Sequence, residues 1–281
     1  MMIISMIIFG TIAPFVRNIS VSSAELALYR AVMAAVLVGG FLLVTGQRID
    51  VKAIKKELLL LLISGAAMGV NWILLFEAYK YTTVSVATLS YYFAPSIVMI
   101  VCPIFFKEKL GAKQIVCFVM STVGLVLITG AAGGGSRDLI GIFFGIGSAV
   151  FYATVMLLNR FIKGVEGIHR TFIQFIAAII VLLPYVICTD GFSLGSLNPL
   201  GWGSLLVVGL VHTGLNYCMY FFALKELPGQ KVAILSYIDP LVAVVISFLF
   251  LNESMTAPQI LGGILILGFT LWSELPSRKK G

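Results

Sequence analysis

The chain has 281 residues, of which 60% are hydrophobic and 11% are charged, and its formal net charge is +7. Soluble proteins carry about 25% charged residues, so this composition excludes an ordinary soluble domain and predicts an all-α integral membrane protein. The positive charge does not predict a nucleic-acid partner, because the basic residues lie in short joins between apolar segments and form no patch.

Ten apolar segments are long enough to be membrane-spanning helices. In chain order they cover residues 1–17, 24–45, 57–80, 83–106, 112–131, 138–161, 168–188, 202–224, 231–251 and 257–275. Helices are required because each unpaired backbone group in hydrocarbon costs several kcal/mol. The first segment lacks a basic start and a small-residue cleavage site, so we expect it to be a span and not a signal peptide.

The chain repeats itself with a shift of 145 residues. Residues 57–130 and 202–275 align without a gap and pair Asn71 with Asn216, Pro95 with Pro240 and Glu108 with Glu253. Each copy holds three spans, and an odd number inverts the second copy in the bilayer, as in many carriers. With weaker matches in the preceding spans, the sequence predicts two inverted five-helix repeats at 1–132 and 137–276, followed by a basic cytoplasmic tail at 277–281.

The distribution of Lys and Arg predicts the orientation. Fifteen of the nineteen basic residues fall in joins on one side, whereas the opposite side has only Arg17, Arg30, Lys80 and Arg137. Because basic joins stay in the cytoplasm, we expect both termini there, in a bacterial inner or plasma membrane. A protein with ten spans from an internal duplication can function without a second subunit, so a monomer is expected.

Two doubled motifs indicate a family. Residues 89–95 read LSYYFAP and are followed by FKEKL at 106–110, while LSYIDP at 235–240 is followed by LNESM at 251–255. With ten spans in two halves, the whole chain resembles the EamA-type transporters of the drug/metabolite transporter superfamily. This resemblance implies movement of amino acids, drugs, nucleobase-like compounds, choline or other metabolites by alternating access. No Walker-type loop is present, so ATP drive is not expected.

Asp239 is the first candidate for the transport site. It lies about eight residues into its span, roughly 12 Å deep, where a carboxylate costs about 2.5–3.5 kcal/mol and therefore needs a cavity or a partner. It could bind a cation or carry a coupling proton, or it could accompany the Pro240 kink and be satisfied by local hydroxyls such as Ser236. The repeat places Ala94 at the equivalent position, so the acid breaks the symmetry.

Further candidates lie at similar depth. Asn71 and Asn216 could hold a ligand from both halves or tie helices together at about 0.6 kcal/mol each. Aromatic rings could form a cage for an organic cation or serve packing; they are Trp72, Tyr91, Tyr92, Tyr152, Tyr217, Tyr220 and Tyr237. Pro95 and Pro240 are the predicted hinges. The four cysteines lie in apolar segments without metal-ligand spacing, so neither a metal nor another cofactor is expected.

Four polar residues are candidates for coupling or gating. Arg30 and Glu77 fall near the outer ends of their spans and are expected to form a salt bridge, or to act as a gate or a carboxylate-binding arginine. His212 could titrate or could be a hydrogen-bonded packing residue. Asn159 is a candidate for the cytoplasmic gate. Glu108 and Glu253 are expected to cap or orient the next spans.

These observations favour a secondary-active transporter of a small metabolite, working around a midplane cavity between the two halves. Export of an amino acid or a drug-like compound is the first choice, with protons as the candidate coupling ion. A carrier for choline-like quaternary amines or other organic cations is the alternative, and a non-transporting membrane subunit is the remote one. No His-Glu-x-x-His motif or similar cluster of polar groups is present, so enzymatic activity is not expected.

Overall fold

A computed structural model describes residues 1–47, 50–106, 111–130, 135–165, 167–189, 191–227, 232 and 235–275. Among them, seven helical segments are long and apolar enough to cross a membrane, and two shorter apolar ones span Met2–Arg17 and Ile238–Phe250. Together with the helix Ala257–Glu274, these segments correspond to the ten predicted spans. No strand occurs in this part of the chain, so the predicted all-α membrane fold is confirmed. The proposed tail at 277–281 lies outside the described residues.

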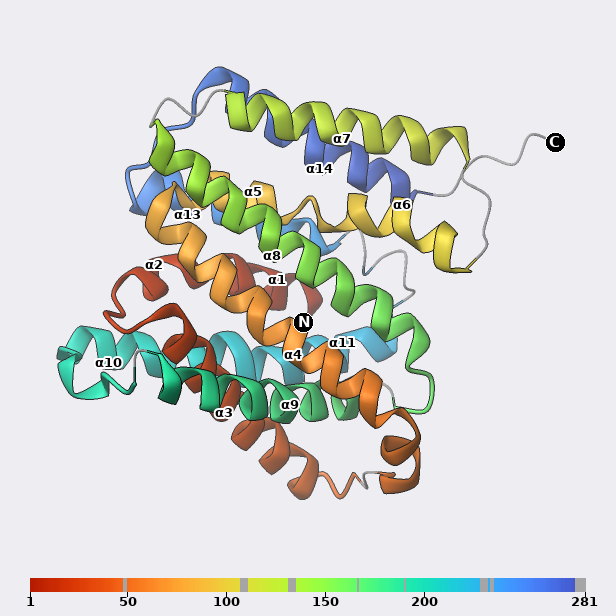
Figure 1. Cartoon of the computed structure of the whole chain (residues 1–281), viewed down its shortest axis with the longest axis vertical. Helices are drawn as coiled ribbons and strands as arrows, with labels where there is room; N and C mark the ends of the chain where they lie inside the picture. The colour runs from red at the N-terminus through yellow and green to blue at the C-terminus, as the bar shows by residue number, and fades with distance from the viewer. Residues whose placement is uncertain are drawn as a thin grey trace.

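The helices follow the predicted spans, and several spans are broken. In chain order they are α1 (Met2–Gly10), α2 (Ile12–Arg17), α3 (Ser23–Val44), α4 (Val51–Tyr81), α5 (Val84–Tyr91), α6 (Ala94–Phe106), α7 (Ala112–Gly130), α8 (Ser136–Phe161), α9 (Gly167–Cys188), the 3₁₀ turn η1 (Leu194–Ser196), α10 (Pro199–Leu206), the π-helix η2 (Val207–Leu215), α11 (Asn216–Glu226), α13 (Ile238–Phe250) and α14 (Ala257–Glu274). Figure 1 shows them crossing the molecule between its left and right ends.

Short polar residues fix where several helices begin. The side chain of Ser22 accepts a hydrogen bond from the Glu25 backbone at the start of α3, and Thr83 does the same for Val86 at the start of α5. Thr256 and Gln259 form a reciprocal capping box at α14. Such caps satisfy backbone donors that have no partner within the helix.

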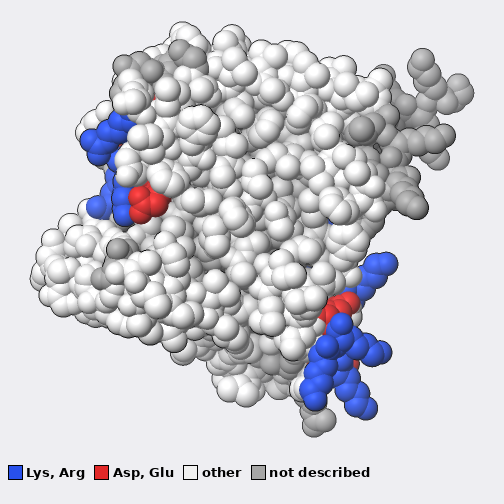
Figure 2. Space-filling view, viewed as in Figure 1, with Lys and Arg blue, Asp and Glu red and all other residues white. Residues whose placement is uncertain are grey.

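Charged side chains gather at the two ends of the bundle. Figure 2 shows them at the left and right edges, with a broad uncharged surface between them. One end, here the Lys52 end, carries the exposed residues Lys52, Lys55, Lys56 and Lys163. The other, the Arg17 end, carries Arg17, Lys80 and Arg137. An uncharged belt between two charged rims is the surface that a bilayer requires.

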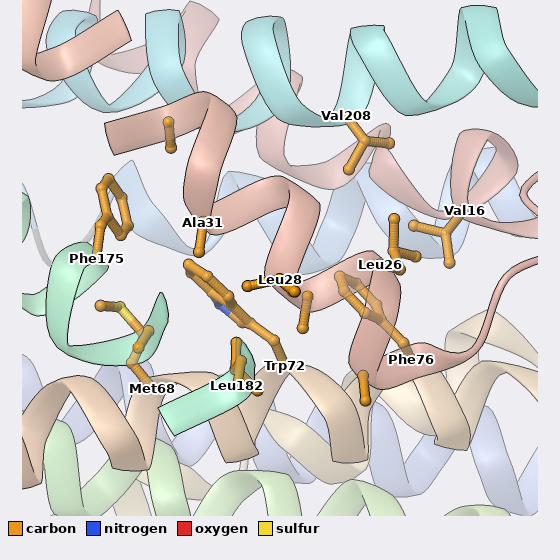
Figure 3. Packing of buried hydrophobic residues seen from close by; sticks show 14 of the residues in the cluster. Val16, Leu26, Leu28, Ala31, Met68, Trp72, Phe76, Phe175, Leu182 and Val208 are labelled. Atoms are coloured by element: carbon orange, nitrogen blue, oxygen red, sulfur yellow. The ribbon is translucent and has the colours of Figure 1, made fainter. Parts of the chain in front are cut away.

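Small residues allow the central helices to pack closely. A Cβ on Gly65 of α4 would lie 2.5 Å from the Gln174 carbonyl oxygen of α9, and one on Gly145 of α8 would lie 2.8 Å from the Ser90 Cβ of α5. These are backbone approaches that only glycine permits. Next to them, Trp72 and Phe76 of α4 pack between α3 and α9, as Figure 3 shows.

Three spans are interrupted at similar depth. α1 gives way to α2 at Thr11, α5 gives way to α6 at Tyr92, and α13 begins after Tyr237. Pro95 and Pro240 lie in the first turns after two of these breaks, where their missing N–H groups cost little. Broken helices in transporters commonly surround the substrate site, because their free backbone groups must face a cavity or protein.

Candidate functional site

A cavity of about 310 Å³ lies among the broken helices. Its lining comes from α1, α2, α3, α4, α5, α8, α9, α11 and α13, and so from both halves of the sequence. Eleven predicted site residues line it: Arg30, Asn71, Trp72, Tyr91, Tyr92, Tyr152, Asn159, Tyr217, Tyr220, Ser236 and Asp239. A cavity of this size is within the range of small-molecule sites.

Asp239 receives a hydrogen bond from a different span. The Tyr92 hydroxyl donates to Asp239 Oδ2 at 2.6 Å, which joins the break between α5 and α6 to the start of α13. The Ser236 hydroxyl instead donates to the Val232 carbonyl at 2.9 Å. Asp239 Oδ1 accepts no hydrogen bond from the described residues, so one carboxylate oxygen remains available to a ligand.

Arg30 places a guanidinium in the same cavity. Its Nε donates to Thr213 Oγ1 at 2.7 Å, and its Cζ lies 4.4 Å from the centroid of the Trp72 ring. The residue is only 5% exposed. Neither Nη group donates a hydrogen bond to a described residue, and no salt bridge joins Arg30 to Asp239. A buried arginine held in this way offers a planar pair of donors that fits a carboxylate.

Tyrosines form one wall beside Asp239. The rings of Tyr91 and Tyr152 stack with centroids 5.0 Å apart, and Tyr92 meets Tyr91 edge to face at 5.4 Å. Tyr217 contacts Phe9 and Phe175 edge to face, at 5.5 and 5.3 Å. The rings therefore pack against one another and line the cavity at once, so the cage and packing alternatives do not exclude each other.

Asn71 also combines two roles. Its Nδ2 lies 2.8 Å from both the carbonyl and the hydroxyl oxygen of Ser148 and donates to them, and that hydroxyl donates back to the Asn71 carbonyl at 3.0 Å. These bonds tie α4 to α8. Asn71 nevertheless lines the cavity, and its Oδ1 accepts no hydrogen bond from the part of the chain that the structure describes.

A polar network lines the cavity toward the Lys52 end. Gln174 Nε2 donates to Ser64 Oγ at 2.6 Å and to Asn159 Oδ1 at 2.8 Å, while Arg170 Nη1 donates to the Asn159 carbonyl at 3.1 Å. Asn159 was a predicted gate residue, whereas Gln174 and Arg170 were not predicted from the sequence. Their spacing of four residues, together with Thr171, would have placed three polar groups on one face at the start of α9.

Comparison with known proteins identifies the family. The sequence profile of the EamA-like transporter family matches residues 1–130 and 139–273. The chain belongs to this family. It is 30% identical to the uncharacterized transporter YxxF of Bacillus subtilis (strain 168), an alignment that covers 94% of this chain and 85% of the relative. An uncharacterized transporter of Archaeoglobus fulgidus is 26% identical over 97% of this chain and 95% of its own length.

A solved crystal structure shares the fold of this EamA member. It superposes with a TM-score of 0.66, covers 95% of this chain and 93% of its own, and is 15% identical in sequence. That likeness concerns the fold alone. The family and the relatives show that the chain is a membrane transporter, and the predicted family is confirmed.

Asn216 lies outside the cavity, unlike its repeat partner Asn71. It is 0% exposed, and its Nδ2 donates to the Ser5 carbonyl of α1 at 3.0 Å. Its Oδ1 accepts no hydrogen bond from any residue that the structure describes. Asn216 therefore ties α11 to α1 and does not contact the cavity, because α1 covers the face of α11 that the amide occupies.

Two other predicted site residues also lie away from the cavity. Tyr237 is 9% exposed and interacts with Thr270 of α14. His212, on the π-helix η2, lies 3.1 Å from Thr11 Oγ1 through Nε2 and 3.2 Å from the Val207 carbonyl through Nδ1. Its ring packs on Phe15 with centroids 5.1 Å apart. His212 thus has the hydrogen bonds and ring packing expected of a packing histidine, one of the two alternatives that the sequence offered.

The predicted salt bridge between Arg30 and Glu77 is wrong. Glu77 Oε1 instead contacts Lys80 Nζ at 2.9 Å, three residues along the same helix. On an α-helix that spacing puts the two side chains next to each other. Arg30 is held inside the cavity by Thr213 and Trp72. Glu77 does not line the cavity.

From its position we expected Glu253 to cap or orient α14, but it does not cap this helix. Thr256 and Gln259 do so. Glu253 instead forms a salt bridge with Arg17, with Nη2 and Oε1 2.5 Å apart. Its repeat partner Glu108 lies outside the described residues.

Proposed function

We propose that this EamA transporter is a secondary-active carrier that exports a small zwitterionic metabolite of the amino acid type by alternating access. One observation carries the proposal. Arg30 and Asp239 line the same cavity, make no contact with each other, and each keeps unused hydrogen-bonding capacity. Opposite charges held apart in a desolvated cavity favour a ligand that carries both charges.

The contacts suggest how such a ligand binds. Its carboxylate would accept from the two Nη groups of Arg30, whose guanidinium is fixed in orientation by Thr213 and Trp72. Its ammonium group would meet Asp239 and the faces of Tyr91 and Tyr152, which attract cations. A neutral drug-like compound would leave both protein charges unpaired.

Organic cations such as choline-like amines are the second candidate. The aromatic wall beside Asp239 favours them. Arg30 counts against them, because a ligand with only positive charge would share the cavity with a fixed guanidinium. The zwitterion is therefore the first choice.

Exposure along the cavity supports loading from the Lys52 end. Asn159, Arg170 and Ser236 are partly exposed there, whereas Tyr79 and Ala243 are buried at the Arg17 end. The excess of basic residues makes the Lys52 end cytoplasmic in our proposal. Substrate would then enter from the cytoplasm, as export requires. Asp239 would carry the coupling proton in exchange for the ammonium group, and the carrier would act as a monomer.

Thermal-shift binding tests the substrate class. Purified protein is screened against amino acids, quaternary amines and nucleobases, and a ligand at 100 times its dissociation constant should stabilise it by about 2.7 kcal/mol. We expect an amino acid to stabilise the wild type but not Asp239→Asn or Arg30→Gln. Glu77→Gln, which removes a carboxylate outside the cavity, is the matched control and should keep the full shift.

Two outcomes would contradict this assignment. A quaternary amine whose shift survives Arg30→Gln and vanishes in Asp239→Asn would establish the organic-cation alternative. An amino acid shift that survives both variants would place its site outside the cavity. Uptake of the same ligand into proteoliposomes, with and without an imposed pH gradient, then tests coupling in wild type and Asp239→Asn.

A further inference from the structure

An interhelical ion pair lies at the Arg17 end, beyond the cavity. Arg17 ends α2, Glu253 lies in the join between α13 and α14, and Nη2 and Oε1 are 2.5 Å apart. The side chains are 33% and 10% exposed, respectively. The pair therefore connects elements that are more than two hundred residues apart in the chain.

Glu253 is held in place from several directions. The Val84 backbone N–H, at the start of α5, donates to Oε2 at 2.8 Å, and the Ser247 hydroxyl of α13 donates to the same oxygen. The Glu253 N–H donates to the Ser247 carbonyl at 3.2 Å. The preceding residue, Asn252, has φ of 53°, a left-handed conformation that asparagine tolerates better than most residues. This turn folds the join back toward α2.

Arg17 connects the pair to the cavity wall. Its Nη2 also donates to the Tyr79 carbonyl at 3.5 Å, and Tyr79 lines the cavity at its buried end. The ion pair thus joins α2 and the α4–α5 join, from the first half of the sequence, to the α13–α14 join from the second. Any motion that carries α2 away from the α13–α14 join must break it.

We propose that Arg17 and Glu253 form the latch of the gate at the Arg17 end, and that the pair must open before the cavity can release its ligand there. This inference rests on the proposed alternating access. A partly exposed ion pair suits a contact that breaks in every cycle, because water replaces much of the lost interaction. Arg17 and Glu253 are positioning residues and do not touch the substrate.

The neighbouring Lys80–Glu77 pair provides a matched comparison. It lies at the same end and its N–O distance is 2.9 Å, but both residues belong to α4. Motion of α2 away from the α13–α14 join would leave it intact, because neither residue belongs to those elements. Removing this pair should therefore change the surface charge without changing access to the cavity.

Access can be measured without a known substrate. The four native cysteines are replaced by alanine, and a single reporter is introduced by Ala243→Cys, at a position that lines the cavity and is 4% exposed. Intact cells are treated with a membrane-impermeant maleimide. We expect slow labelling with the latch present and about tenfold faster labelling with Arg17→Gln or Glu253→Gln, since each removes the ion pair that joins α2 to the α13–α14 join.

Graded variants separate a latch from a general loss of structure. Arg17→Lys keeps the charge and should restore slow labelling, whereas Arg17→Glu opposes two carboxylates and should give the fastest rate. Glu77→Gln should label at the parent rate. In inside-out vesicles the parent reporter should label faster than in intact cells, since the proposed access route to the cavity is from the Lys52 end.

Two results would overturn the latch. One is unchanged labelling in both Arg17→Gln and Glu253→Gln; the other is an equal increase in Glu77→Gln. Faster labelling with no amino acid transport in the parent protein would keep the latch and refute the proposed substrate. Normal amino acid transport, with a labelling rate that does not change in Arg17→Gln or Glu253→Gln, would support the proposed substrate and refute the latch.

Discussion

The two copies of the repeated sequence use equivalent residues in different ways. Tyr92 lines the cavity and donates to Asp239, whereas Tyr237, 145 residues later, faces α14. Asn71 lines the cavity and Asn216 does not. The acid Asp239 itself has only Ala94 as its counterpart. The shared pattern thus gives both copies a similar framework of breaks and prolines, and the departures from that pattern give the cavity its charge.

Neighbouring helices explain the difference between copies. α1 packs so tightly beside Asp239 that a Cβ on Gly10 would lie 2.6 Å from its carbonyl oxygen. The weak match between the first spans of each half aligns residues 9–18 with 151–160. In it, the residue equivalent to Gly10 is Tyr152, which stacks on Tyr91. One copy therefore brings backbone against backbone at this depth, and the other fills the same place with an aromatic ring.

The largest effect on transport should come from adding a side chain at Gly10, where α1 packs closely against α13. We expect Gly10→Ala to abolish transport, because the added methyl group meets the Asp239 carbonyl and Val242 within 2.7 Å and must push α13 away. Overpacking of this kind costs about 1–3 kcal/mol. Gly203→Ala, with nothing within 4 Å of the new methyl group, is the control. Transport of the identified ligand and thermal unfolding are compared; equal activity in the two variants would count against a required close approach.

A smaller effect should distinguish the two tyrosines. Tyr92→Phe removes the hydroxyl that donates to Asp239 and should slow transport about tenfold and shift its pH dependence, since a bond to a charged group is worth roughly 1.5–3 kcal/mol. Tyr237→Phe removes the same atom away from the cavity and should stay within about twofold of wild type. Matched rates would show that Asp239 does not depend on Tyr92.

The sequence predicted the helical spans and the breaks next to Pro95 and Pro240, because these depend on hydropathy and on proline. It did not predict the break between α1 and α2 at Thr11. It could not predict which tyrosine faces the cavity. In a membrane protein, lipid-facing and buried surfaces are both apolar, so helical periodicity does not identify the inner face. The Arg17–Glu253 pair was missed for another reason. Both residues lie at the ends of spans. The charge of Arg17 was used to predict orientation and Glu253 was expected to cap a helix, and only the fold brings the two side chains together.

The smallest expected effect is the difference in stability between variants of Asn216 and of Asn71. Among the described residues, Asn216 Oδ1 has no hydrogen-bond partner and Nδ2 has one. Replacing it by leucine loses one hydrogen bond but also removes a buried unsatisfied oxygen, and such an oxygen costs about 1–3 kcal/mol. Asn71→Leu breaks two hydrogen bonds to Ser148 and changes the cavity wall. We expect the free energy of unfolding of Asn216→Leu to lie within about 1 kcal/mol of the wild-type value.

Asn71→Leu should be less stable than Asn216→Leu by about 1–2 kcal/mol, because the Ser148 hydroxyl loses its partner amide. Only Asn71→Leu should change the KM for transport, since only Asn71 lines the cavity. Thermal unfolding and KM, measured on the same two variants, keep stability apart from ligand contact. If Asn216→Leu raised KM as much as Asn71→Leu, the two copies would contribute alike at this position, and the asymmetry of the cavity would rest on Asp239 and Tyr92 alone.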